Sequence, residues 1–151
     1  MSSPVRVLIA DKMDPKAAAI FRERGIAVDE KPGLSPEELK AIAKDYDGIA
    51  VRSSTKIGAA VMDAALPRLK VIGRAGIGVD TIDVPAASAR GIVVMNTPFG
   101  NSITTAEHAI AMLFALAREI PQADQSTQAG KWEKNRFLGV ELAGKTLGLI
   151  G

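Results

Sequence analysis

Residues 69–102 read LKVIGRAGIGVDTIDVPAASARGIVVMNTPFGNS, and this stretch decides the fold. Two apolar runs, at residues 69–72 and 92–94, are typical of buried strands, and a short helical segment lies between them. Strand, helix and strand in this order predict a parallel βαβ unit. Each strand is followed by a loop of small residues, and open α/β sheets bind ligands past the carboxyl ends of their strands. The stretch therefore predicts the fold class and the edge of the sheet where a site should lie.

Strands and helices alternate in the same way toward the start of the chain. We expect strands over residues 5–10, 26–29 and 48–51, and helices over residues 14–24, 35–44 and 58–65. Two helix starts are marked by an N-cap residue followed by proline, at Asp14-Pro15 and Ser35-Pro36. The pattern predicts an α/β fold, a flavodoxin-like parallel sheet flanked by helices, over residues 1–98.

The pattern changes over residues 99–151. One long helix is expected over residues 102–120, with Thr104 and Glu107 as a capping box at its start and Pro121 ending or bending it. Apolar residues surround this helix almost completely, which predicts that another domain or another subunit covers it.

The last part of the chain predicts the beginning of a second domain. Residues 130–142 read as an irregular polar segment with Trp132 as a buried anchor. Residues 146–151 read as a strand that finishes in Gly151, the first glycine of a dinucleotide-binding G-x-G-x-x-G turn. We therefore expect a linking helix and the first strand of a truncated Rossmann domain in residues 99–151.

Composition and charge argue against several classes of function. The chain has 151 residues, a net charge of +2 and few aromatic residues, so a nucleic-acid partner is not expected. Without cysteine there is no disulfide, thiol nucleophile or cysteine metal site, which suits the cytoplasm. We expect no signal peptide and no membrane span, because the apolar runs end well before about 18 residues or carry charges.

The glycine-rich loop after residue 72 is the first candidate site. Its glycines let the backbone approach a small ligand and aim N–H groups at an anion, and Arg74 could pair with a carboxylate or a phosphate. Gly76-x-Gly78 is not the main dinucleotide fingerprint, because Thr81 stands where the third glycine is needed. A tight turn after a strand remains the alternative interpretation.

The second candidate loop is Arg52-Ser53-Ser54-Thr55-Lys56, which places two cations and three hydroxyls at a strand end. Such a cluster can hold a phosphate through charge-assisted hydrogen bonds, or it can be a solvated polar loop. His108 is the single histidine and lies on the expected long helix, where the neighbouring Glu107 points in another direction. We therefore give His108 a structural role and not a catalytic one.

The order of the segments GRAGIGVD, GIVVMNTPFGNS and AEHAIAMLFALAR resembles the D-2-hydroxyacid dehydrogenase family. The following run, PQADQSTQAGKWEKNRFLGVELAGKTLGLIG, resembles the branch of that family that acts on 3-phosphoglycerate. The resemblance covers the whole chain. It implies NAD as cofactor, oxidation of 3-phosphoglycerate to 3-phosphohydroxypyruvate in serine biosynthesis, and a cytoplasmic homo-oligomer, a dimer or tetramer.

The same resemblance implies roles for individual residues. The implied substrate-binding residues are Arg52, Thr55, Lys56, Arg74, Ala75, Gly76 and Asn101. Ile77 and Gly151 are the implied cofactor contacts. Lys134 or Arg136 could reach the active site of a neighbouring subunit. The histidine, glutamate and arginine that carry catalysis in the family are expected beyond residue 151, so the chain alone should be inactive.

Three alternatives stay open. The substrate could be another 2-hydroxy acid, although the cations beside Thr55 favour a phosphorylated one. A phospho-receiver domain shares the flavodoxin-like fold, but it needs an aspartate at the end of the third strand, where this chain has Arg52. A dehydrogenase-like corepressor that senses NAD and binds peptides is disfavoured by the segments after residue 95.

Overall fold

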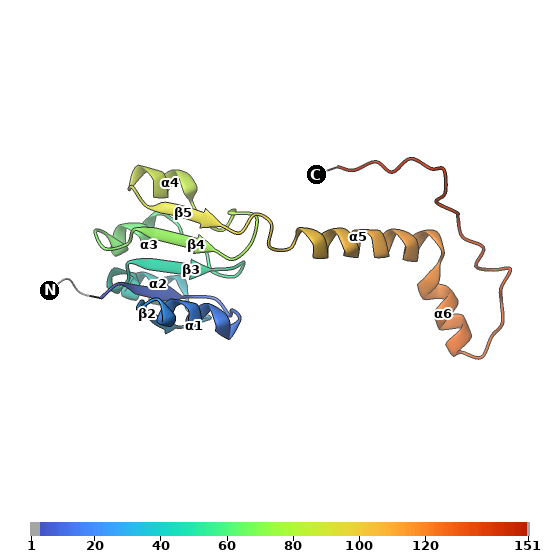
Figure 1. Cartoon of the computed structure of the whole chain (residues 1–151), viewed down its shortest axis with the longest axis horizontal. Coiled ribbons are helices and arrows are strands. Elements are labelled where there is room, and N and C mark those ends of the chain that lie inside the picture. The colour runs from blue at the N-terminus through green and yellow to red at the C-terminus, as the bar shows by residue number, and fades with distance from the viewer. Residues whose placement is uncertain (1–3, 151) are drawn as a thin grey trace. The chain divides into compact units, whose positions relative to one another are not determined.

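The structure is a computed structural model that describes residues 4–150. The chain divides into two compact units, Met1–Gly100 and Asn101–Gly151. Figure 1 colours the first unit from blue to yellow and the second from gold to red. The observed division follows residue 100, and the sequence places the expected boundary after residue 98.

A parallel five-stranded sheet forms the frame of the first unit, in the order β2-β1-β3-β4-β5. The strands are β1 (Arg6–Ile9), β2 (Ala27–Glu30), β3 (Gly48–Val51), β4 (Val71–Arg74) and β5 (Val93–Asn96). This is the strand order of flavodoxin-like folds, in which the direction of winding reverses between β1 and β3. The predicted α/β, flavodoxin-like sheet is confirmed, with strand bounds shifted by at most two residues.

Helices connect the strands, and their starts follow local sequence. The connecting elements are α1 (Pro15–Glu23), α2 (Pro36–Ile42), the 3-10 turn η1 (Ala43–Asp45), α3 (Ala59–Ala65) and α4 (Val84–Ala89). Both predicted N-caps are confirmed. The Asp14 carboxylate accepts the Lys16 N–H at 2.9 Å, and Ser35 exchanges hydrogen bonds with Glu38 in a capping box. These bonds satisfy N–H groups that the first helical turn leaves without partners.

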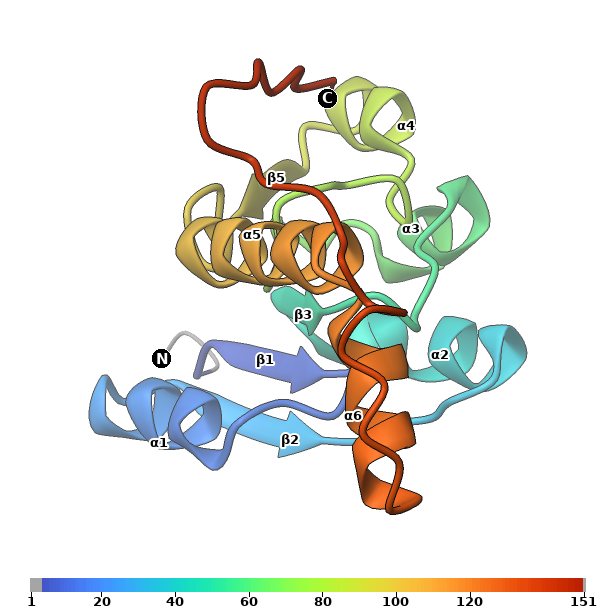
Figure 2. The same ribbon diagram turned by 90° about the vertical axis from the view of Figure 1, so that its right-hand side faces the viewer.

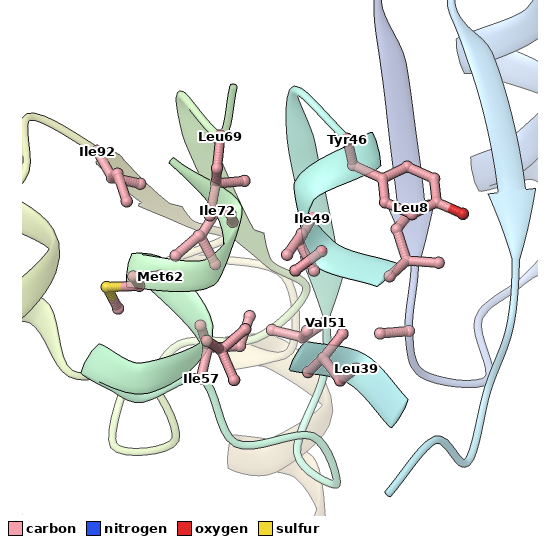
Figure 3. Close-up of a cluster of buried hydrophobic side chains, with 14 of the residues drawn as sticks. Leu8, Leu39, Tyr46, Ile49, Val51, Ile57, Met62, Leu69, Ile72 and Ile92 are labelled. Carbon is pink, nitrogen blue, oxygen red and sulfur yellow. The ribbon is translucent and has the colours of Figure 1, made fainter. Parts of the chain in front are cut away.

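The main core lies between the sheet and helices α2, α3 and α4, which lie together on one face (Figure 2). Figure 3 shows Leu8, Ile49 and Ile72, from three neighbouring strands, on the same side as Leu39 of α2 and Met62 of α3. All five side chains are buried, and removing their apolar surface from water drives this layer together.

The opposite face of the sheet is covered only near β1 and β2. Helix α1 packs there, and Val7, Ile9 and Ala18 are buried. Toward β5 the same face is bare, because Val93 and Met95 are 56% and 54% exposed. Side chains alternate along a strand, so these two residues point away from the main core.

The second unit contains α5 (Ser102–Ala117), α6 (Ile120–Gln128) and an irregular segment over residues 129–150. The single helix predicted over residues 102–120 is wrong at its end, because Glu119 adopts a left-handed conformation with φ of 53° and separates two helices. Pro121 lies in the first turn of α6, where its missing N–H breaks no helical hydrogen bond. Within residues 4–150, no helix is both long enough and apolar enough to cross a membrane.

The predicted capping box at the start of α5 is wrong. The helix begins at Ser102, so Thr104 already lies inside it. Its N-cap is Asn101, which makes no side-chain hydrogen bond to the helix. A neighbouring residue therefore took the cap position that Thr104 was expected to fill.

Two predictions for the irregular segment are also wrong. Trp132 is 84% exposed and not buried, because the segment forms no core around it. Residues 146–150 form no strand. A strand needs a second strand to which it can hydrogen-bond, and the described part of this unit contains no other strand. Gly151, the last residue of the predicted strand, lies outside the described residues.

Candidate functional site

The carboxyl edge of the sheet brings several loops together. The pairing register places Val51 of β3 opposite Arg74 of β4, and Arg74 opposite Asn96 of β5. The loops that follow these strands therefore begin side by side, at the edge where such sheets bind ligands. Asp11 joins them from the end of β1, because its carboxylate reaches the backbone of Arg52.

The loop after β3 is built around the carboxylate of Asp11. Its Oδ2 accepts the N–H of Arg52 at 2.6 Å and the N–H of Thr55 at 3.3 Å. Its Oδ1 accepts the hydroxyl of Thr55 at 2.7 Å. The Thr55 side chain is thus committed to the inside of the loop and does not face solvent. The Arg52 side chain is exposed and donates from Nη1 to the Lys12 carbonyl at 3.3 Å.

Asp11 is held as a carboxylate. Burial alone would raise the pKa of this group. The hydrogen bonds from the Thr55 hydroxyl and from the backbone N–H groups of residues 52, 54 and 55 outweigh burial, so the pKa of Asp11 lies below its ordinary value of 3.8. At neutral pH the loop therefore encloses a negative charge, while Arg52 and Lys56 carry positive charge on its outer side.

Arg74, the last residue of β4, lies over the glycine loop, which we define as residues 75–78. Its Nε–H donates to the carbonyl oxygen of Arg52 at 3.2 Å. Its guanidinium fills the space beside Gly76, where an added Cβ atom would lie 2.5 Å from Nη1 and 3.1 Å from Cζ. Glycine at position 76 therefore makes room for the arginine. Within residues 4–150 the two terminal nitrogens of Arg74 donate to no protein acceptor, so they are available to a ligand.

The backbone of the glycine loop is held on both sides. The N–H groups of Ala75 and Gly76 donate to backbone carbonyls at the ends of β3 and β4. From β5, the Asn96 side-chain amide donates to the Ile77 carbonyl at 2.7 Å. The N–H groups of Ile77 and Gly78 make no hydrogen bond within the described part of the chain. These two amides, unlike the two before them, have no protein acceptor. The Asp80 carboxylate lies beside Gly78, 2.9 Å from where a Cβ of that residue would stand, so Ile77 offers the amide that is freer for an anion.

A hollow of about 320 Å³ lies beside Arg74, at the ends of the strands and next to α1. Its wall is apolar where Phe21, Ala50 and Met95 line it, and polar where Arg74 and Asn96 line it. Small-molecule sites commonly combine an apolar wall with a few polar groups that fix the ligand's orientation. The hollow is mostly apolar, and Arg74 and Asn96 form its polar edge.

The predicted site residues of the first unit gather at this edge. Arg52, Lys56 and Arg74 lie on the two neighbouring loops, and Thr55 supports the first loop from inside. Ile77 is 44% exposed on the second loop.

The remaining predicted residues lie elsewhere. Asn101 belongs to the second unit, as the N-cap of α5, and His108 is exposed on the same helix. Lys134 is exposed, while Arg136 donates to the Glu133 carboxylate at 3.2 Å.

Two residues of the site, Asp11 and Asn96, are absent from the predicted set. Asp11 lies two residues after β1 and Asn96 ends β5, so both occupy the carboxyl edge of the sheet. A polar residue at the end of an apolar strand was the available signal. That signal does not tell whether the side chain will face a ligand or, as in both cases here, hold a neighbouring loop.

These residues form a candidate small-anion site at the carboxyl edge of a flavodoxin-like sheet. Comparison with known proteins identifies the family. Residues 7–143 match the family described as D-isomer specific 2-hydroxyacid dehydrogenase, catalytic domain. The chain belongs to this dehydrogenase family. The resemblance that the sequence motifs indicated is thereby confirmed.

Two curated members of the dehydrogenase family match nearly the whole chain. The D-3-phosphoglycerate dehydrogenase of Archaeoglobus fulgidus is 53% identical over 147 residues, which make up 97% of this chain and 28% of that protein. The D-3-phosphoglycerate dehydrogenase of Homo sapiens is 51% identical over 146 residues, 97% of this chain and 27% of that protein. The chain therefore spans about a quarter of the length of these relatives.

A solved structure of the dehydrogenase family agrees with the fold. It is the NAD⁺-bound 3-phosphoglycerate dehydrogenase of Entamoeba histolytica, which superposes with a TM-score of 0.67 at 31% identity. The superposition covers 77% of this chain and 40% of that one.

Proposed function

We propose that this chain is the substrate-binding part of an NAD-dependent D-3-phosphoglycerate dehydrogenase, a cytoplasmic enzyme of serine biosynthesis. The longer enzyme would oxidise the 2-hydroxyl group of 3-phosphoglycerate to the ketone of 3-phosphohydroxypyruvate. The observation that carries the proposal is a pair of arginines at neighbouring strand ends, Arg52 and Arg74, which a hydrogen bond connects. Arg74 also lies at the edge of a hollow large enough for a small molecule. Two relatives with 53% and 51% sequence identity are named D-3-phosphoglycerate dehydrogenase, which supports the same reaction.

The two anionic ends of 3-phosphoglycerate suit the two loops. Arg74 offers two free terminal nitrogens, and the amides of Ile77 and Gly78 lie in the same loop, a set that suits a planar carboxylate. Arg52 and Lys56 are exposed cations on the adjoining loop and suit a phosphate.

The described residues bind and orient, and they do not exchange protons or electrons with the substrate. Oxidation at C2 removes a hydride from the carbon and a proton from the hydroxyl. NAD, when bound, accepts the hydride. Arg52 and Arg74 neutralise the substrate's charge and hold C2 in one orientation, and such positioning supplies a large part of an enzymatic rate enhancement. We place the base that takes the proton beyond residue 151.

The glycine loop does not fit the pyrophosphate of NAD. A dinucleotide fingerprint joins a strand directly to a helix through three glycines. Here Thr81 takes the third glycine's place, the next helix begins only at Val84, and Arg74 fills the space beside Gly76. We propose that the cofactor is held by the remainder of the longer enzyme, with Gly151 in its fingerprint and Ile77 against its nicotinamide end.

The proposed function can be tested in a chimeric enzyme, in which this chain replaces the matching 147 residues of the Archaeoglobus fulgidus enzyme. The chimeric enzyme should reduce NAD with 3-phosphoglycerate, and the 151-residue chain alone should not. Arg52→Ala and Arg74→Ala should each raise the KM for 3-phosphoglycerate roughly 10- to 100-fold, the worth of a hydrogen bond to a charged group. The KM for NAD should not change.

Arg24→Ala is the control, because Arg24 is an exposed arginine at the end of α1. A folded chimeric enzyme that does not reduce NAD with 3-phosphoglycerate would overturn the proposed function. The choice between a phosphorylated acid and another 2-hydroxy acid depends on Arg52. Arg52→Ala should raise the KM for 3-phosphoglycerate much more than the KM for glycerate. An equal rise for both acids would favour an unphosphorylated substrate.

We also propose that the longer enzyme is a homo-oligomer that uses α5. No residue of α5 is buried in the described structure, although the helix is apolar almost all round. Ile103 and Leu116 are 76% and 78% exposed. Leu116→Glu should lower the mass of the chimeric enzyme measured by light scattering. Lys40→Glu, at an exposed lysine of α2, should leave the mass unchanged. A mass unaffected by Leu116→Glu would exclude α5 from the subunit contact.

A further inference from the structure

The buried polar side chains within residues 4–150 form a contacting pair, Asp11 and Thr55, which are 4% and 9% exposed. Burial of a carboxylate opposes folding unless hydrogen bonds replace the lost water. Asp11 receives these bonds from the loop after β3, through the Arg52 N–H, the Thr55 N–H and the Thr55 hydroxyl. The carboxylate is therefore tied to the conformation of that loop.

Stability alone does not explain a carboxylate at this position. A buried charge with good partners is often no more stabilising than a well-packed apolar side chain of similar volume. The benefit of Asp11 has to lie in the conformation that its directional acceptors impose on residues 52–55.

Arg52 is held through both ends of its own backbone. Its N–H donates to Asp11 at 2.6 Å, and its carbonyl oxygen accepts the Nε–H of Arg74 at 3.2 Å. One residue thus connects the buried carboxylate to the guanidinium on the next strand. A shift of the Arg52 backbone would move both arginine side chains away from their present positions.

We propose that Asp11 is a positioning residue for the substrate: its hydrogen bonds aim Arg52 and Arg74 at the anion without touching it. The identity of the anion rests on the proposed function. The aiming of the arginines does not, because it is a property of the chain without any ligand.

Two substitutions separate the hydrogen bonds of Asp11 from its charge. Asp11→Ala removes every acceptor. Asp11→Asn keeps one oxygen for the two backbone N–H groups, and its new amide can donate to the Thr55 hydroxyl oxygen. The Thr55 proton then has an acceptor in the Ala10 carbonyl, 3.3 Å from the hydroxyl oxygen. Asp11→Asn should therefore preserve the loop, although the charge is gone.

Asp47 provides a matched control at the opposite edge of the sheet, directly before β3. Its carboxylate also accepts three hydrogen bonds, from the Arg6 N–H at 2.8 Å and from Nε and Nη2 of Arg68 at 3.2 and 3.0 Å. Asp47→Ala should therefore destabilise the same sheet and leave the two arginines of the anion site in place.

The test is the exchange of the Arg74 Nε–H with solvent, measured by nuclear magnetic resonance on the 151-residue chain. We expect Asp11→Ala to raise the exchange rate by roughly tenfold or more, as local opening does. Asp11→Asn and Asp47→Ala should stay near the wild type. In the chimeric enzyme, Asp11→Ala should raise the KM for 3-phosphoglycerate roughly 10- to 100-fold, as misplacement of a binding group does, and Asp11→Asn should restore it.

Several outcomes would overturn the proposal. One is a folded Asp11→Ala chain with unchanged Arg74 exchange, and another is an Asp11→Asn chain that exchanges as fast as Asp11→Ala. If Asp11→Ala does not fold, Thr55→Val removes only the hydroxyl, with its contacts to Asp11 at 2.7 Å and to the Ala10 carbonyl at 3.3 Å, and should also speed the exchange. Unchanged exchange in that variant would equally overturn the proposal. If the exchange pattern holds while the chimeric enzyme ignores 3-phosphoglycerate, Asp11 keeps its positioning role and only the proposed function fails.

Discussion

The Nε–H of Arg74 donates to the carbonyl oxygen of Arg52, 3.2 Å away. This bond orients the Arg74 guanidinium through one nitrogen and leaves the other two for a ligand. Because the acceptor is a backbone carbonyl, the bond fixes the Arg74 guanidinium relative to the backbone of Arg52. Flexible side chains would otherwise lose conformational entropy when they close on an anion, and this arrangement reduces that loss.

Arg74→Lys should therefore behave as a severe substitution. A lysine ammonium is a single donor centre and cannot bond the Arg52 carbonyl while it also presents a fork to a carboxylate. In the chimeric enzyme we expect the KM for 3-phosphoglycerate to rise roughly 10- to 100-fold. Steady-state kinetics check this, with Arg24→Lys as the control. A near-normal KM for Arg74→Lys would show that charge alone is enough.

Gly76→Ala should displace Arg74 without unfolding the sheet. The new Cβ would lie 2.5 Å from Nη1, closer than real contacts allow, so the guanidinium has to move. We expect a rise in the KM for 3-phosphoglycerate of roughly tenfold, the loss of part of a charge-assisted contact. Gly58→Ala is the control, since a Cβ there meets nothing within 4 Å. Equal kinetics for the two alanine variants would contradict this account of Gly76.

Asn96→Asp should loosen the glycine loop. The substitution replaces the donor that holds the Ile77 carbonyl at 2.7 Å with a carboxylate oxygen, and two acceptors repel each other at that distance. It also adds a negative charge to the wall of the hollow beside Arg74. We expect the KM for 3-phosphoglycerate to rise roughly tenfold or more. Asn135→Asp, on an exposed loop of the second unit, should have no such effect.

Tyr46 should make the first unit sensitive to alkali. Burial, followed by the hydrogen bond from its hydroxyl to Asp29 at 2.8 Å, raises the pKa of Tyr46 to about 12. The folded state thus favours the protonated phenol, so the contribution of Tyr46 to stability is complete below the ordinary pKa of 10.0 and is lost as the pH rises through about 12.

This titration can be followed directly, because Tyr46 is the only tyrosine. Tyrosinate absorbance of the folded chain should rise near pH 12, and a midpoint near 10.0 would contradict the buried hydrogen bond. Tyr46→Phe should lower the free energy of unfolding at neutral pH by about 1 kcal/mol. It should also remove the part of the alkaline loss that belongs to this residue.

The first unit follows its local sequence closely. The helix start at Ser35 depends on Glu38, three residues away, and the capping box forms as the pair predicts. The bounds of β3 agree with its apolar run, which Asp47 and Arg52 flank. Pro121 predicted that the helix ends or bends near residue 120. The exact position of the break could not be predicted, because a glutamate in a left-handed conformation carries no local signal such as glycine provides.

For the candidate anion site, position along the strands was enough to place Arg52 and Arg74 at the carboxyl edge of the sheet and not enough to predict which residues hold their loops; their role in binding stays a prediction. Arg52 and Arg74 could be selected because each lies at the end of an apolar strand. The inward turn of Thr55 could not be predicted, because its hydroxyl bonds Asp11, which is 44 residues away in the sequence. Whether a polar side chain at a strand end faces the ligand or the neighbouring loop is decided by such long-range partners.

The strands β3, β4 and β5 end at the same level of the sheet, so the candidate site depends on the correct pairing of these strands. Val51 lies opposite Arg74, and Arg74 opposite Asn96. If β4 slipped by one residue, Ile72 would leave the core and Arg74 would lose the carbonyl that orients it. A sheet misfolded in this way could not keep the proposed anion site, so affinity for a small anion, if the proposed function holds, would also report whether the strands have paired correctly.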